Sequence, residues 1–109
     1  MASGTIACKE ITSFGDVTVS TTPTRCDTFR WYKNGNVVQV KIDNVQYSDT
    51  SIVILGHLPS GYAPSATVYF LGIDVSGNVI KFFIDTSGNI RVVENTGKLL
   101  YGSVTFIIG

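Results

Sequence analysis

One seven-residue segment is written twice in this chain, as Ile73-Asp74-Val75-Ser76-Gly77-Asn78-Val79 and, eleven residues later, as Ile84-Asp85-Thr86-Ser87-Gly88-Asn89-Ile90. Each copy places a D-x-S-G-N block inside a run of β-branched and aromatic residues. Glycine supplies the positive φ of a tight turn, while Asp and Asn hydrogen-bond their own backbone. The repeat therefore predicts a three-stranded antiparallel meander, with strands at roughly 66–74, 79–85 and 90–94.

A second turn signal lies upstream, where Asn34-Gly35 separates the alternating runs 28–33 and 36–42. Asn-Gly in this setting favours a two-residue type I′ hairpin turn, because both central residues need positive φ. With these two residues at the centre, Lys33 faces Asn36 and Arg30 faces Gln39, and side chains alternate between faces. The predicted core face comprises Phe29, Trp31, Val38, Val40 and Ile42. The predicted polar face comprises Thr28, Arg30, Tyr32, Gln39 and Lys41.

The rest of the chain continues the β pattern. Short strands are expected at 5–9, 16–20, 51–55 and 101–108, and irregular segments at 13–15, 21–24, 44–50 and 58–65. No stretch has an apolar period of 3.6 residues over three turns, so no significant helix is expected. The sequence predicts an all-β, antiparallel, jelly-roll-like sandwich or barrel, in a single domain spanning residues 1–109.

The strands of the meander are apolar on both faces. Ile80, Phe82 and Ile84 share one face, while Val79 and Phe83 flank Lys81 on the other. In a monomeric two-sheet domain the outer face should be polar, and this chain has no helix to cover it. We therefore expect another copy of the same chain to cover the outer face.

The composition argues against several partners. The 109 residues carry no net charge, only 15% are charged, and no two Lys or Arg residues are adjacent, so a nucleic-acid surface is not expected. No apolar run approaches the ~18 residues of a membrane span, and the first residues lack the features of a signal peptide. Cys8 and Cys26 are too few for a disulfide scaffold and are wrongly spaced for zinc, so buried thiols are favoured over a disulfide.

Catalytic and metal-binding patterns are not found. His57 is the single histidine and lies outside any nucleophile motif, so a structural role is expected for it. The D-x-S-G-N blocks have too few carboxylates for calcium loops. Asp74 and Asp85 could be neighbours, as in a glycosidase, but their place in turns already explains them. We predict no enzyme activity, no metal and no cofactor.

Aromatic residues next to polar groups are the remaining candidates for a site. An aromatic ring can stack on a sugar while nearby polar groups bond its hydroxyls. Trp31 is assigned to the core, whereas Tyr32 should lie outside, beside Arg30 and Gln39. A solvated sheet face is the alternative interpretation. The predicted saccharide-binding residues are Arg30, Tyr32 and Gln39, with Tyr62 and Arg91 as weaker candidates.

Four segments occur in an order that resembles a known family. They are Trp31–Val38 (W-Y-K-N-G-N-V-V), Leu58–Phe70 (L-P-S-G-Y-A-P-S-A-T-V-Y-F), Ile84–Ile90 (I-D-T-S-G-N-I) and Tyr101–Phe106 (Y-G-S-V-T-F). Together they span about residues 26 to 108 and resemble the C-terminal head domain of tail-fibre and baseplate receptor-binding proteins of phages of Gram-positive bacteria.

The resemblance implies a function that the residues alone do not give. Such heads are all-β, assemble as trimers at a fibre tip of the virion, and bind saccharides of the host cell wall. It therefore implies a homotrimeric, non-catalytic adhesion domain. The alternatives are a structural fibre-tip or trimerisation domain without a ligand and, less favoured, a polysaccharide depolymerase.

Overall fold

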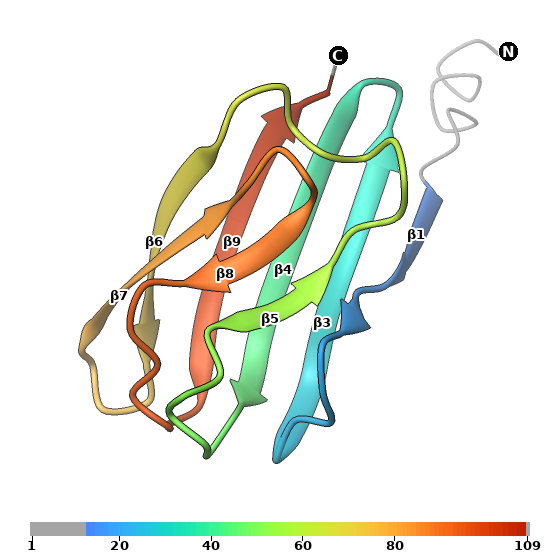
Figure 1. Cartoon of the computed structure of the whole chain (residues 1–109). Coiled ribbons are helices and arrows are strands. Elements are labelled where there is room, and N and C mark those ends of the chain that lie inside the picture. The colour runs from blue at the N-terminus through green and yellow to red at the C-terminus, as the bar shows by residue number, and fades with distance from the viewer. Residues whose placement is uncertain (1–12, 109) are drawn as a thin grey trace, which may run out of the picture.

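The computed structural model describes residues 13–108, which form nine strands and no helix (Figure 1). The strands are β1 (Ser13–Asp16), β2 (Thr18–Val19), β3 (Arg25–Asn34), β4 (Val37–Gln46), β5 (Ile54–His57), β6 (Val68–Asp74), β7 (Val79–Ile84), β8 (Asn89–Val92) and β9 (Leu100–Ile107). They join one antiparallel sheet in the order β1-β3-β4-β9-β6-β7-β8-β5-β2. The predicted all-β class is confirmed. No part of residues 13–108 forms a helix long and apolar enough to cross a membrane.

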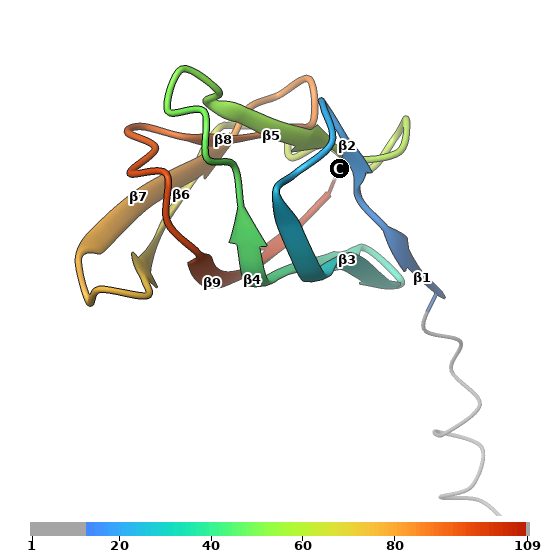
Figure 2. The same cartoon turned by 90° about the horizontal axis from the view of Figure 1, so that it is seen from below.

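The two edges of this sheet are neighbours in the sequence. β1 and β2 are separated only by Val17, so residues 13–20 pass from one edge of the sheet to the other. The Val17 N–H donates to the Phe29 carbonyl at 2.9 Å, and the Ser20 N–H donates to the Leu55 carbonyl at 3.2 Å. The sheet is therefore coiled into a nearly closed barrel, and Figure 2 shows the strands curving around a common interior.

The inner face of the coiled sheet is the hydrophobic core. It brings Val38, Val40 and Ile42 of β4 into one cluster with the buried residues of the meander, and Trp31 packs against that cluster. The alternation of side chains along the strands therefore predicted the core face correctly. Tyr47 is also buried, and its hydroxyl donates to the Leu55 carbonyl at 2.7 Å. Burial raises the pKa of Tyr47 to about 12.

The predicted register of the first hairpin is wrong. Asn34 pairs with Val37, so the turn is centred on Gly35-Asn36 rather than Asn34-Gly35. Gly35 has a φ of +60°, which fits a type II′ turn with glycine at the first central position. Consequently Tyr32 lies opposite Gln39, and Arg30 lies opposite Lys41 instead of Gln39. Each residue of β3 faces a partner two positions away from the predicted one, so the assignment of side chains to the two faces remains correct.

Other strands in the first half of the chain also differ from the predicted bounds. Residues 13–15 were expected to be irregular, but they belong to β1, where Gly15 lies opposite Trp31. A Cβ on Gly15 would lie 2.8 Å from the Trp31 ring, so glycine allows this close pairing. The strand expected at 51–55 is found at Ile54–His57 instead. The strand expected at 5–9 lies outside the described residues.

Cys26 does not have the burial expected of it. Cys26 is exposed, because β1 pairs with β3 only from Arg30 onward and leaves the first residues of β3 without a neighbour on that side. Cys8 lies outside the described residues, so the expectation that the two thiols do not pair stays a prediction.

Both D-x-S-G-N blocks form the predicted turns. Gly77 and Gly88 have φ values of +86° and +84°. The Asp74 carboxylate is buried and accepts hydrogen bonds from the backbone N–H groups of Ser76 and Asn78, the Asn78 side chain and the Thr96 hydroxyl, at 2.9–3.0 Å. These bonds, with that from Asn78 the largest contributor, lower the pKa of Asp74 to about 2.

Acid should destabilise the fold through Asp74. A carboxyl whose pKa falls from 3.8 to about 2 on folding contributes stability above about pH 4 and loses that contribution as the pH falls toward 2. We expect Asp74→Asn to be less stable than wild type near pH 6 and to lose less stability between pH 4 and 2. Urea unfolding at several pH values measures both, and an equal loss of stability in the two proteins over this range would contradict the assignment.

Candidate functional site

A row of side chains crosses four adjacent strands on the outer face of the sheet. Phe14 of β1 pairs with Tyr32 of β3, Tyr32 pairs with Gln39 of β4, and Gln39 pairs with Thr105 of β9. Direct cross-strand partners share a face, so all four point away from the core. The Gln39 amide is oriented by donating to the Ser103 hydroxyl at 3.3 Å.

This row borders a shallow hollow of about 220 Å³, which we call the Tyr32 site. Its lining residues are Tyr32, Asn34, Val37, Gln39 and Thr105. Two amides and the Thr105 hydroxyl thus surround the Tyr32 ring, which carries a hydroxyl of its own, so the site can both donate and accept hydrogen bonds. The site holds no carboxylate and no cation. It suits a small neutral ligand that has an apolar face and several hydroxyl groups.

Arg30 lies beside the Tyr32 site but does not line it. Its guanidinium carbon is 5.3 Å from the centre of the Phe14 ring, and its Nε is 3.4 Å from the Asp16 carboxylate. The Phe14 and Tyr32 rings are 6.2 Å apart. An exposed ion pair contributes little stability, yet the ring and the carboxylate together fix the direction of the guanidinium. Arg30 therefore extends the donor groups of the Tyr32 site toward β1.

The other two predicted site residues lie elsewhere. Tyr62 meets Trp31 edge-on at 4.9 Å, and the Lys33 ammonium lies 5.5 Å from the centre of the Tyr62 ring. Trp31 and Lys33 alternate with Tyr32 along β3, so Tyr62 is on the opposite face from the Tyr32 site. Arg91 is on β8, which β6 and β7 separate from β9. The structure thus groups Arg30, Tyr32 and Gln39 and leaves Tyr62 and Arg91 apart.

Sequence reasoning missed two members of the row. Phe14 was placed in an irregular segment, because its pairing depends on β1 joining β3, a contact that no local pattern specifies. Thr105 was assigned to the final strand, but without the β4–β9 pairing its neighbours could not be known. The alternation of Ser13-Phe14-Gly15-Asp16 is the only local signal that could have suggested β1.

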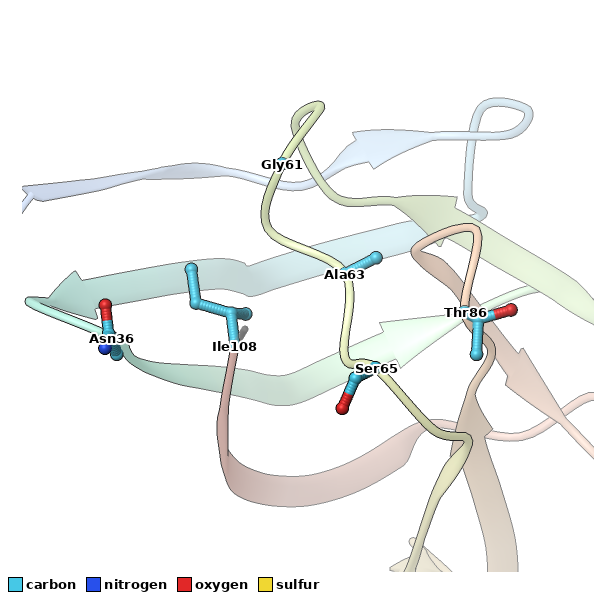
Figure 3. A pocket seen from close by; sticks show the side chains of 6 residues that line it. All are labelled: Asn36, Gly61, Ala63, Ser65, Thr86 and Ile108. Atoms are coloured by element: carbon cyan, nitrogen blue, oxygen red, sulfur yellow. The ribbon is translucent and has the colours of Figure 1, made fainter.

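A second hollow, of about 500 Å³, lies among the loops at one end of the barrel. It is lined by Asn36, Gly61, Ala63, Ser65, Thr86 and Ile108. Figure 3 shows the loop that carries Gly61, Ala63 and Ser65 running between Ile108 on one side and Thr86 on the other. The lining has one amide and two hydroxyls but no aromatic ring and no charge, so it offers less to a saccharide than the Tyr32 site.

Residues 13–108 contain no group of three or more His, Cys, Asp or Glu side chains placed to hold a metal ion. The exposed His57 has a local partner, since its Nδ1 lies 2.5 Å from Oδ1 of Asn89 in the second D-x-S-G-N turn. Asp85 also accepts from the N–H groups of Ser87 and Asn89 in that turn. The side chains of His57, Asn89 and Asp85 therefore take part in hydrogen bonds at this turn.

Among known proteins, a solved structure is similar to this chain, whereas no family model and no curated protein matches it. Among solved structures, it is similar to the receptor binding protein (gp15) of Listeria phage PSA, with a TM-score of 0.69 over 97% of this chain and 70% of that chain. The chain has the fold of a phage receptor-binding protein. Because the sequence identity is only 16%, the likeness concerns the fold alone. At that level it confirms the resemblance seen in the sequence.

Tyr62 should report on the environment of Trp31, the single tryptophan of the chain. Tyr62→Ala removes the ring that packs edge-on against the indole, so we expect red-shifted tryptophan emission, stronger acrylamide quenching and a loss of about 1 kcal/mol of stability. Tyr69→Ala is the matched control, because Tyr69 is exposed on β6 and should leave the emission unchanged. Unaltered emission in Tyr62→Ala would show that this contact does not persist in solution.

Proposed function

We propose that this chain is a receptor-binding domain of a phage tail, and that it binds a saccharide of the bacterial surface at the Tyr32 site. One observation carries the proposal: an outward aromatic ring with convergent amides, hydroxyls and an oriented arginine, on a chain with the fold of a phage receptor-binding protein. A virion location follows from the same proposal.

The residues of the Tyr32 site and their neighbours Phe14 and Arg30 have complementary roles in this proposal. The rings of Tyr32 and Phe14 would contact the C–H face of a pyranose. The side chains of Asn34, Gln39 and Thr105 would exchange hydrogen bonds with its hydroxyls, and Arg30 would add charged donors at the edge. These contacts use groups already held by the sheet, so little conformational entropy would be lost on binding.

The proposed role is binding without turnover. Glycoside hydrolysis ordinarily uses two carboxyl groups on either side of the scissile bond. The residues that line the Tyr32 site include none, and the nearby Asp16 is paired with Arg30. Adhesion therefore fits the site better than a depolymerase activity.

Substitution of Tyr32 or Arg30 should weaken binding to bacterial surfaces. We expect Tyr32→Ala and Arg30→Ala to bind about tenfold more weakly, which corresponds to about 1.4 kcal/mol. The measurement is binding of labelled domain to an array of Gram-positive wall glycans and to intact cells. Thr50→Ala is the control, because Thr50 is exposed in the loop between β4 and β5.

Three results would contradict this proposal. Equal binding by Tyr32→Ala and wild type would place the ligand elsewhere. No binding to any wall glycan would favour the structural fibre-tip or trimerisation alternative. Release of reducing ends from wall polymer would favour a depolymerase.

We also propose that the domain works as a homotrimer, held by an apolar area that we call the β6–β7 patch. The patch consists of Leu71, Ile73, Val79 and Val93, all exposed. Leu71 and Ile73 pair with Lys81 and Val79 across β6 and β7, and the Val93 N–H bonds the Lys81 carbonyl, so Lys81 alone interrupts the patch. Exposed apolar surface of this kind is typical of protein interfaces.

A charge in the β6–β7 patch should dissociate the assembly. Val79 is 66% exposed and lies opposite Ile73, so Val79→Asp should fold normally but leave a buried carboxylate with no cation facing it across the strands if copies associate there. We expect sedimentation velocity to give trimers for wild type and monomers for Val79→Asp at micromolar concentration. Thr50→Asp is the charge-matched control and should stay trimeric. A wild-type monomer at these concentrations would contradict the association.

A further inference from the structure

A second aromatic row lies on the outer face of the meander. Tyr69 of β6 pairs with Phe83 of β7, and Phe83 pairs with Arg91 of β8, so the three side chains point outward together. The rings of Tyr69 and Phe83 are 5.7 Å apart. The Arg91 guanidinium carbon is 5.6 Å from the centre of the Phe83 ring and 3.6 Å separates Nη1 from the Asp85 carboxylate. We call these residues the Tyr69 row.

The Tyr69 row repeats the arrangement beside the Tyr32 site. Each has two aromatic rings on adjacent strands, an arginine over one of them, and an aspartate that holds the arginine. The ring separations are 6.2 and 5.7 Å, the arginine-to-ring distances 5.3 and 5.6 Å, and the ion pairs 3.4 and 3.6 Å. In both places one ring faces water, since Phe14 is 61% and Tyr69 74% exposed.

Neighbouring groups hold the side chains of the Tyr69 row in place. Asp85 accepts hydrogen bonds from the backbone of Ser87 and Asn89, so the second D-x-S-G-N turn fixes the carboxylate that orients Arg91. Phe83 is half-buried and forms a floor between Tyr69 and Arg91. An adjoining hollow of about 400 Å³ includes Tyr69, Leu71 and Lys81 in its lining. Ring surface and donors are thus both pre-organised, which lowers the entropic cost of binding.

We propose that the Tyr69 row is a second saccharide subsite, which takes an uncharged pyranose; this rests on the proposed saccharide-binding function. The ring of Tyr69 stacks on the sugar, and Arg91 and the Tyr69 hydroxyl bond its hydroxyl groups. A neutral ligand is favoured because Asp85 balances the charge of Arg91. The Lys81 ammonium in the adjoining row is a second cation, so an anionic sugar is included in the test.

The two sites cannot be filled by one sugar ring. In Figure 2, β1 lies on the opposite side of the molecule from β6 and β7, so the Tyr32 site and the Tyr69 row face different directions. A surface that repeats the same sugar can occupy both at once, and two linked weak sites give a higher overall affinity than either alone.

NMR titration of the full chain tests the second subsite. The probes are N-acetylglucosamine and rhamnose as neutral pyranoses and glucose 6-phosphate as the anionic one, followed by the Arg30 and Arg91 Nε–H signals and the backbone amides. We expect neutral sugars to shift both sets of signals. Tyr69→Ala should weaken the Arg91 response about tenfold without altering the Arg30 response, and Tyr32→Ala should do the reverse.

Two further variants serve as controls. Tyr69→Phe keeps the ring and should retain most of the Arg91 response. Thr50→Ala changes a side chain that is exposed in the loop between β4 and β5, away from the Tyr69 row, and should leave the Arg91 response intact.

Each outcome distinguishes the two proposals. Shifts confined to the Tyr32 site would overturn the second subsite and leave the proposed function standing, whereas no shift from any sugar would overturn both. Stronger binding of glucose 6-phosphate at Arg91 would overturn the assignment to a neutral ligand. If Tyr69→Ala changed the oligomeric state but not the Arg91 response, the row would be an interface and not a subsite.

Discussion

A single coiled sheet can hide only one of its two faces, and this constraint governs the molecule. Residues 13–108 contain no helix to cover the outer face, and the inward-facing apolar side chains pack into one core. Hydrophobic burial stabilises the inner face, while the outer face must meet water or a partner. Rings and aliphatic side chains nevertheless lie on the outer face of β1, β6, β7 and β9. Partner binding explains that pattern better than solvation does.

The coil itself depends on close approach between β6 and β9. These strands pair only at Ile73–Tyr101 and Asp74–Leu100. A Cβ on Gly72 would lie 2.1 Å from the Tyr101 carbonyl oxygen, so only glycine fits there. The Phe70 and Phe82 rings stack at 5.0 Å beside this crossing. Asn95 lies near the same end of the barrel, where its side chain donates to the carbonyls of Tyr47, Asp49 and Ile52 and so joins the loop after β8 to the loop between β4 and β5. The meander is thereby folded over the core of the first hairpin.

The turns and the strand faces could be predicted from the sequence, whereas the pairing of strands that are distant in the sequence could not. The D-x-S-G-N turns follow from hydrogen bonds within five residues, so their geometry could be predicted. Strand faces follow from alternation, which is why Tyr32 and Gln39 were rightly placed together. The register failed because Asn34-Gly35 and Gly35-Asn36 can each form a two-residue turn. The place of Phe14 beside the Tyr32 site depends on the pairing of β1 with β3, which no local pattern specifies.

The outer face carries two kinds of chemistry, which suit the two kinds of partner that we propose. Aliphatic side chains such as Leu71 and Val79 cannot hydrogen-bond a hydroxyl, so they suit a protein surface that is itself apolar. An aromatic ring with an oriented arginine satisfies both the C–H face and the hydroxyls of a sugar. Tyr69 and Leu71 are two residues apart on the same face of β6, so these chemistries meet there. Copies packed on the β6–β7 patch would hold their Tyr69 rows beside the contact, and assembly would then set the spacing at which repeated sugars are bound.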